Sequence, residues 1–146
     1  MPLPRGYFFR HRGRVYPAPA FVYFVHDGIL QTSPGRPGVA HEGVIESATA
    51  KPTDSAFGED AYPTFFTKVA AVGYTLAHDH GFSDGNKRTA LEVMTLTLKR
   101  NGLYPDPTER EAATVMVLVA MGLLDVPGLR VALMAWCGID PADAEA

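Results

Sequence analysis

The sequence is short of cysteine and of long apolar runs, and each shortage excludes a class of protein. Cys137 is the only cysteine among 146 residues, so no disulfide forms within the chain. This is typical of a reducing compartment, and we expect a cytoplasmic protein. The longest apolar run, residues 115–124, is interrupted by Gly122 and is too short to span a bilayer. We therefore expect no membrane partner.

Charge of one sign is also in short supply, whereas apolar residues are plentiful. The net charge is −3 at pH 7, so the molecule has no broad attraction for nucleic acid, and we expect no direct nucleic-acid binding. Hydrophobic residues make up 47% of the chain, which is enough for a folded core. A length of 146 residues indicates one domain.

The first nineteen residues differ from the rest, because arginines are mixed with aromatic residues there. Such a mixture can bind nucleic acid, but a short charged run is more often simply solvated. We therefore predict an N-terminal arm over residues 1–19 and a domain over residues 20–146, with the arm packed against the domain or against another copy. The residues concerned are Arg5, Tyr7, Phe8, Phe9, Arg10, Arg12, Arg14 and Tyr16.

Apolar residues recur with helical spacing along most of the chain, and strand-like alternation is scarce. Residues 86–100 are apolar on most sides, so this helix should be central and buried. A polar stretch with Gly58 predicts a small hairpin-like flap at residues 55–61. The pattern as a whole predicts an all-α bundle with that flap. The expected helices cover residues 21–30, 41–50, 63–78, 86–100, 108–121 and 126–136.

The most informative stretch is His80–Arg88, which we call the motif segment. It reads His-Gly-Phe-Ser-Asp-Gly-Asn-Lys-Arg, and the apolar residues 89–98 follow it directly. This order predicts a loop that leads into the N-terminus of a buried helix. Such a helix end has unpaired backbone N–H groups and a positive dipole, which suit a phosphate. Lys87 and Arg88 add formal charge at the same place.

Two further side chains of the motif segment have chemistry that fits a phosphate site. His80 has a side chain that titrates near neutrality and can take a proton from a hydroxyl group. Asp84 offers carboxylate oxygens to a hard cation such as Mg²⁺. An Asp-Gly-Asn turn or a Lys-Arg pair alone is usually structural, but the joint pattern is rare by chance. Together the residues favour transfer of phosphate from a nucleotide to a hydroxyl group.

At these residues the chain resembles the Fic/Doc (Fido) family, whose core motif is His-x-Phe-x-Asp/Glu-Gly/Ala-Asn-Gly/Lys-Arg. Within that family it resembles the Doc, or "death on curing", toxins, because Lys87 stands where most Fic proteins have glycine. Leu91 stands where adenylylating Fic proteins usually have a second arginine. Other segments are also similar to Doc, and the resemblance covers roughly residues 20–138.

The resemblance implies a Fic/Doc-type fold and the activity of a Doc-like toxin. Such a toxin transfers phosphate from ATP or another nucleoside triphosphate to a hydroxyl of a target protein, by resemblance translation elongation factor Tu, and so blocks translation. A Phd-like antitoxin would be its partner, and the flap would bind the target. The resemblance implies one catalytic base, one Mg²⁺ ligand and a phosphate cradle with two cations: His80, Asp84, Gly85, Asn86, Lys87 and Arg88.

The sequence alone leaves three alternatives open. The first keeps the fold but transfers adenylate to a protein hydroxyl. The second is an HD-type metal phosphohydrolase, for which His78 and Asp79 form the suggestive pair. The third is a binding module without catalysis.

Two further expectations concern electrostatics and regulation. Glu92 lies one turn after Arg88, so an ion pair between them is expected. Many Fic proteins inhibit themselves through a Ser/Thr-x-x-x-Glu-Gly/Asn segment, and this sequence has no proper match to it. Inhibition would then come from a separate chain.

Overall fold

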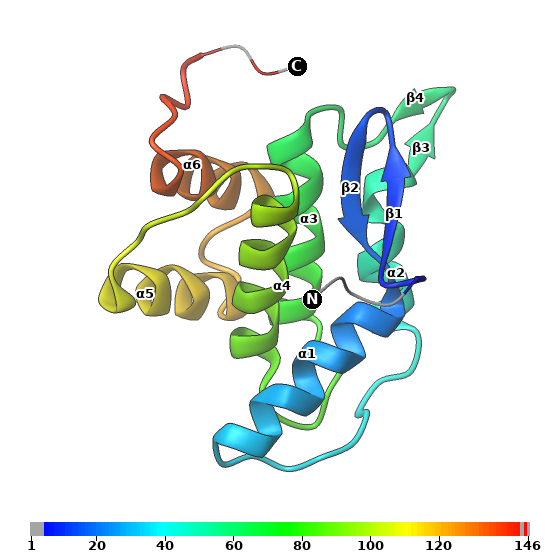
Figure 1. Ribbon diagram of the computed structural model, residues 1–146, viewed down its shortest axis with the longest axis vertical. Coiled ribbons are helices and arrows are strands. Elements are labelled where there is room, and N and C mark those ends of the chain that lie inside the picture. Colours follow the sequence, from blue (N-terminus) through cyan, green and yellow to red (C-terminus); the bar gives the residue numbers. More distant parts are fainter. Residues whose placement is uncertain (1–4, 144, 146) are drawn as a thin grey trace.

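The computed structural model describes residues 5–143 and residue 145, and most of them belong to six helices (Figure 1). Two short antiparallel hairpins complete the fold. The all-α bundle with a small flap is therefore confirmed. The helices are α1 (Pro19–Thr32), α2 (Val44–Ala50), α3 (Phe65–His78), α4 (Asn86–Arg100), α5 (Glu109–Ala120) and α6 (Val126–Trp136), with a 3-10 turn η1 (Lys51–Thr53) after α2. The strands are β1 (Phe8–His11), β2 (Arg14–Pro17), β3 (Ser55–Ala56) and β4 (Glu59–Asp60).

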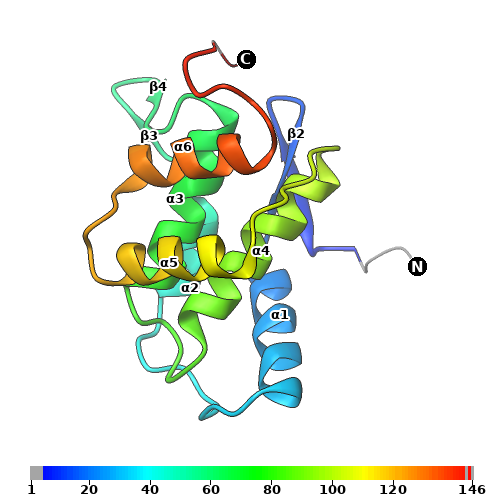
Figure 2. The same ribbon diagram turned by 90° about the vertical axis from the view of Figure 1, so that its left-hand side faces the viewer.

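Helices α3 and α4 lie side by side at the centre of the molecule, as both views show (Figures 1 and 2). Gly73 of α3 explains how closely they approach. A Cβ atom at this position would lie 2.1 Å from Met94 Sδ of α4, so no larger residue fits without repacking. Val93, Met94 and Leu98 of α4 are fully buried, which confirms the central position predicted for this helix.

The other helices cover the central pair on two sides. Helix α1 packs against α4, and α2 packs against α3. Helices α5 and α6 cross the central pair on the side away from α1 (Figure 2). No helix in the described part of the chain has the length and apolar character that crossing a membrane requires.

Capping residues explain several helix starts. Thr64 and Thr108 accept hydrogen bonds from the N–H groups of Thr67 and Glu111, at 3.4 and 3.1 Å, so α3 and α5 begin directly after them. Helix α2 starts at Val44, three residues later than expected. The reason is Gly43, whose φ of 87° is left-handed and incompatible with a helix through that residue.

The N-terminal segment forms a hairpin of β1 and β2 that the sequence pattern did not predict. Its turn is Arg12-Gly13, and both residues have positive φ, as a tight hairpin turn requires. Tyr16 is only 1% exposed and contacts Phe65 of α3 through their rings. The described part of the predicted arm therefore packs against the helices. The division of the chain at residue 19 stays a prediction.

The flap, residues 55–61, contains β3 and β4 and lies beside the N-terminal hairpin (Figure 1). Its turn places Phe57 in full contact with solvent. Asp60 ties the flap to its neighbours. Its carboxylate accepts hydrogen bonds from Nε and Nη2 of Arg12 at 2.7 and 3.0 Å and from Lys68 Nζ of α3 at 2.9 Å.

Candidate active site

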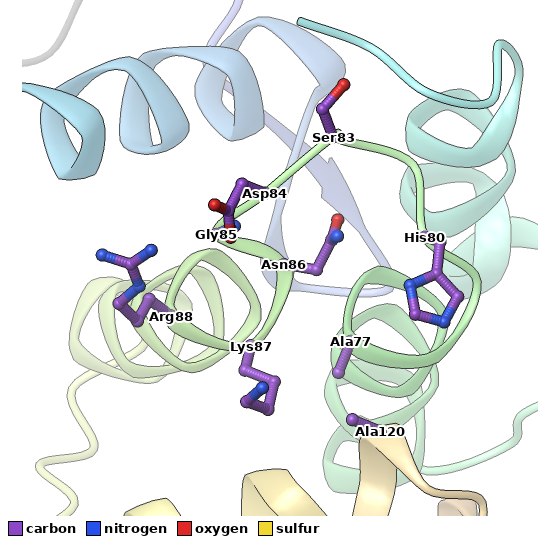
Figure 3. Close-up of a pocket in the computed structure, with 9 residues that line it drawn as sticks. All are labelled: Ala77, His80, Ser83, Asp84, Gly85, Asn86, Lys87, Arg88 and Ala120. Carbon is purple, nitrogen blue, oxygen red and sulfur yellow. The ribbon is translucent and has the colours of Figure 1, made fainter. Parts of the chain in front are cut away.

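The motif segment lies between α3 and α4 and lines a pocket of about 250 Å³ (Figure 3). We call this the motif pocket. His80 lies on one side of it, and Lys87 and Arg88 lie on the other, at the start of α4. Ala77 and Ala120 close part of its wall. All the residues that the sequence predicted for the site line this one pocket, namely His80, Asp84, Gly85, Asn86, Lys87 and Arg88. Their chemical roles stay predictions.

The loop of the motif segment is held by its own side chains. The Asn86 side chain accepts from the Phe82 N–H at 3.0 Å and donates to the Phe82 carbonyl at 2.9 Å. The side-chain amide of Asn86 therefore closes the loop from both of its ends, and the Asn86 backbone N–H at the start of α4 is available to a ligand. Phe82 is buried, as its apolar side chain predicts.

Two histidines outside the motif segment also hold the loop. The His26 ring stacks on Phe82, with 3.7 Å between ring centroids, and His26 Nε2 donates to the Asp84 carbonyl at 2.8 Å. His41 Nδ1 donates to the His80 carbonyl at 2.8 Å. A carbonyl only accepts, so these two nitrogens carry the hydrogen. The sequence offered no signal for these contacts, because they join residues far apart in the chain.

His80 has an unusual backbone and an accessible side chain. Its φ is 54°, a left-handed value that is uncommon for any residue other than glycine. The His80 side chain is exposed to the pocket, and no described residue forms a hydrogen bond with its imidazole. Strained backbone of this kind often occurs at functional sites. The ring is therefore accessible to a proton from a ligand.

Asp84 is a carboxylate held in its charged form. Its oxygens accept from the Arg36 N–H at 3.2 Å and from the Gly85 N–H at 2.9 Å. These two backbone hydrogen bonds, with the nearby charge of Arg88, lower the pKa of Asp84 below its ordinary value. Asp84 is therefore ionised at neutral pH.

The donor set around Asp84 fits Mg²⁺ that is shared with a nucleotide. A carboxylate has about four lone-pair positions, so the two backbone hydrogen bonds leave room for a cation. Mg²⁺ is usually held by one or two carboxylates together with substrate phosphates. Residues 5–143 and 145 contain no group of three or more histidine, cysteine or acidic side chains that would hold a metal alone.

Arg88 does not form the ion pair with Glu92 that the sequence predicted. Its guanidinium donates instead to the Ser33 hydroxyl and, at 3.2 Å, to the Pro34 carbonyl. These oxygens belong to the loop after α1, which lies beside the N-terminus of α4. The helical spacing that predicted the pair carries no information about that loop.

Charge and unpaired donors meet at the start of α4. The first N–H groups of this 15-residue helix have no partner within it, so they are available to an anion. Lys87 is exposed and makes no ion pair with a described residue. Arg88 is also exposed. The pocket therefore combines a positive helix end, two cations, one carboxylate and one accessible imidazole.

The His78–Asp79 pair lies outside the motif pocket. His78 Nδ1 is 2.8 Å from an oxygen of Asp79, and its ring stacks on Tyr74 one turn earlier in α3. Neither side chain lines the pocket. The pair thus occupies a helix end and is separate from the cations of α4.

Two comparisons with known proteins agree with this geometry. Residues 16–98 match the Fic/DOC family, and this range includes the whole motif segment. A stretch of 54 residues is 43% identical to "Toxin Doc" of Mycolicibacterium smegmatis. That stretch covers 37% of this chain and 42% of the relative, so the match spans less than half the length of either protein.

Proposed function

The chain belongs to the Fic/DOC family, and from this premise we propose that it transfers the terminal phosphate of a nucleoside triphosphate to a hydroxyl group of a target protein. Members of the family typically transfer groups from nucleotides. The likeness to a protein named "Toxin Doc" supports the role of a toxin in a toxin–antitoxin pair.

The observation that carries this proposal is the position of Lys87. It lines the motif pocket together with His80 and Asp84, and it makes no ion pair with a described residue. A lysine is a compact point charge that suits a phosphate group in transfer. At residue 91, one turn later, the chain has leucine where an adenylylating protein would have an arginine for the triphosphate. The cations are thus concentrated around the reacting phosphate.

In the proposed reaction His80 acts as general base. Its imidazole takes the proton from the target hydroxyl while that oxygen forms a bond to the γ-phosphorus. The bond from the γ-phosphorus to the bridging oxygen breaks, and the nucleoside diphosphate leaves with that electron pair. The proton remains on His80 until solvent takes it.

Most of the rate enhancement would come from electrostatics, as is usual for phosphoryl transfer. Lys87, Arg88 and the backbone N–H of Asn86 would bind the phosphate oxygens, while the Gly85 N–H stays on the Asp84 carboxylate. Asp84 would hold Mg²⁺, which supplies positive charge to the phosphates when it is bound. The Asn86 N–H is held by the closed loop before the substrate arrives, so this donor needs little reorganisation.

The flap would bind the target protein. Its strands β3 and β4 are short, mostly exposed, and lie at the edge of a two-stranded sheet. Such an edge can add an extended segment of another protein through backbone hydrogen bonds. The exposed ring of Phe57 would add an apolar contact. By family resemblance we propose translation elongation factor Tu as the target and a separate Phd-like antitoxin as the inhibitor.

Purified elongation factor Tu, ATP and Mg²⁺ provide the direct test. After incubation with this protein, the intact mass of the factor should increase by one phosphate. The His80→Ala variant should leave the mass unchanged. A gain of adenylate would reject phosphate transfer in favour of adenylylation. An unchanged mass with the wild-type protein would reject the proposed target.

A further inference from the structure

The loop between α1 and α2 runs alongside the motif segment in the opposite direction, and we call its residues 33–41 the strap. Near the middle of the strap, the Ser83 N–H donates to the Gly38 carbonyl at 2.9 Å. Val39 of the strap forms an antiparallel bridge with Phe82. Residues 34–41 are all exposed, so the strap lies at the surface of the molecule. The motif segment is therefore paired along its length with a surface loop.

Side chains at the two ends of the strap contact the two ends of the motif segment. At one end the Ser33 hydroxyl accepts from the Arg88 guanidinium, which also donates to the Pro34 carbonyl at 3.2 Å. At the other end His41 Nδ1 donates to the His80 carbonyl at 2.8 Å. His80 and Arg88 lie on opposite sides of the motif pocket (Figure 3). The strap thus contacts the proposed base and a proposed phosphate ligand at the same time.

The Ser33 hydroxyl is oriented by α1. It donates to the Ile29 carbonyl at 2.9 Å, so its lone pairs are left for the Arg88 guanidinium. A guanidinium has five N–H donors, and the contacts with Ser33 and Pro34 leave several of them for phosphate oxygens. A long side chain that is already held loses less conformational entropy when it binds a ligand. Ser33 therefore prepares Arg88 for an anion.

The contact from His41 acts on the strained backbone of His80. A left-handed φ in a residue with a side chain persists only where the surrounding structure holds it. The hydrogen bond from His41 fixes the carbonyl of His80 and so restricts its backbone. Because the backbone conformation sets the direction of a side chain, this contact keeps the imidazole in the motif pocket. His41 does not line that pocket, so it acts through His80.

We propose that Ser33 and His41 are positioning residues of the reaction, Ser33 for a cation that binds phosphate and His41 for the general base. This inference rests on the proposed function and extends it to residues outside the motif segment. Because the two residues act on different groups, loss of each should have a different kinetic signature. Ser33 should affect the affinity for ATP, and His41 should affect the transfer rate at saturating ATP. A strap with a merely structural role would change both quantities together in either variant.

Ser33→Ala tests the first end of the strap, with ATP binding in the presence of Mg²⁺ measured by calorimetry. We expect ATP to bind on the order of tenfold more weakly, because a hydrogen bond to a charged group is lost. Ser33→Thr keeps the hydroxyl and should restore the affinity. Thr32→Ala is the matched control, because the Thr32 hydroxyl donates to carbonyls of α1 and Thr32 does not line the motif pocket. Unchanged ATP affinity in folded Ser33→Ala would reject the role of Ser33.

His41→Ala tests the second end. The transfer rate at saturating ATP and target should fall on the order of tenfold, while the ATP affinity stays the same. His41→Asn keeps an N–H donor close to the position of Nδ1 and should restore most of the rate. Glu42→Ala is the control, because Glu42 is the next exposed residue and makes no hydrogen bond with a described residue of the motif segment. A wild-type rate in His41→Ala, or an equal loss of rate and ATP affinity, would reject the role of His41.

A measurement without activity separates this inference from the proposed function. A positive φ brings the N–H proton of His80 close to its own Hα, which gives a strong NMR signal between the two protons. We expect this signal in the wild type and a weaker one in His41→Ala. If the wild type binds ATP but transfers neither phosphate nor adenylate, the proposed function fails, and the ATP affinities and the NMR signal still decide the inference. A full signal in folded His41→Ala would overturn it, and a wild type that binds no ATP would overturn both the proposed function and the role of Ser33.

Discussion

The motif segment and the flap contribute to the same proposed reaction, but they are held in place in different ways. The motif segment is fixed by contacts from several parts of the chain. Val39 forms a bridge with Phe82, and the Ser83 N–H donates to the Gly38 carbonyl at 2.9 Å. The side chains of His26 and His41 hold two more carbonyls of the loop. The flap has only two paired residues per strand and a fully exposed tip.

A single acidic residue ties the flap to the rest of the molecule. Asp60 binds Arg12 of the N-terminal hairpin and Lys68 of α3. Lys68 is only 2% exposed and also donates to the Tyr62 carbonyl, so its buried charge is compensated by these oxygens. The proposed catalytic groups are thus held by the core, whereas the proposed contact of the flap with a target would depend on one ion cluster. Arg12 lies outside the residues that match the Fic/DOC family.

The largest effect should come from His80, because its proposed role as general base acts directly on the reacting hydroxyl group. His80→Ala should reduce transfer by about 10²–10⁴-fold, which is typical for loss of a general base. The side chain is exposed and unbonded to described residues, so the thermal midpoint should hardly change. Transfer assays and thermal melts measure the two quantities. Near-normal activity in this variant would remove His80 from its assigned role.

Asp84 should give the next largest effect, and it tests whether the motif pocket binds metal with nucleotide. Asp84→Asn keeps the shape of the side chain but removes its charge. Changes around a metal ligand typically cost about 10–100-fold in metal affinity, and we expect a loss of at least this order in Mg²⁺-dependent nucleotide binding. Titration of nucleotide with and without Mg²⁺ measures it. Unchanged affinity and unchanged Mg²⁺ dependence would show that Asp84 holds no metal.

Arg12 provides a smaller effect that is confined to the flap. Arg12→Asn removes the guanidinium, while Asn-Gly is a preferred sequence for the same hairpin turn. The flap should then lose one of its two main attachments. We expect faster amide hydrogen exchange in residues 55–61 and a several-fold higher KM for the target. The nucleotide affinity should stay the same, because neither Arg12 nor Asp60 lines the motif pocket.

Arg10→Asn is the matched control for that experiment. Arg10 is exposed on the same hairpin and makes no ion pair with a described residue. It should leave both the exchange and the KM unchanged. Equal effects from the two variants would mean that general charge on the hairpin, and not the Arg12–Asp60 contact, holds the flap.

The smallest effect should be a loss of stability at neutral pH that disappears in acid. Hydrogen bonds from Arg12 and Lys68 hold the pKa of the Asp60 carboxyl well below its usual range. A carboxyl group with a lowered folded-state pKa contributes stability above its unfolded pKa of about 3.9. That contribution is lost as the pH falls from there toward the folded value. Asp60→Asn should therefore be less stable than the wild type at neutral pH, and the difference should shrink below about pH 4. Denaturant melts at several pH values measure this, and a pH-independent difference would contradict it.

Local patterns explain why most of the fold was predictable. Helical spacing and the position of the motif segment are both visible within short windows of sequence. The helix α4 was predicted at Asn86–Arg100 and is found there. The residues that line the motif pocket were also predictable, because most of them lie within the nine residues of the motif segment.

Contacts between distant residues explain what was missed. The β1–β2 hairpin depends on packing of Tyr16 against α3, which no short window contains. The Arg88 guanidinium donates to Ser33 and Pro34 in the loop after α1, and these contacts depend on how that loop packs beside α4. His26 and His41 gave no local sign that they hold the motif loop.

Phosphate transfer requires the terminal phosphate of the nucleotide to reach His80, and ATP labelled on either the α- or the γ-phosphate tests this directly. Each form is incubated with this protein, Mg²⁺ and a cell extract, and label in protein is measured. We predict label from the γ position alone, and Lys87→Gly should sharply reduce that signal. Label carried into protein from the α position would contradict phosphate transfer and show that the protein transfers adenylate.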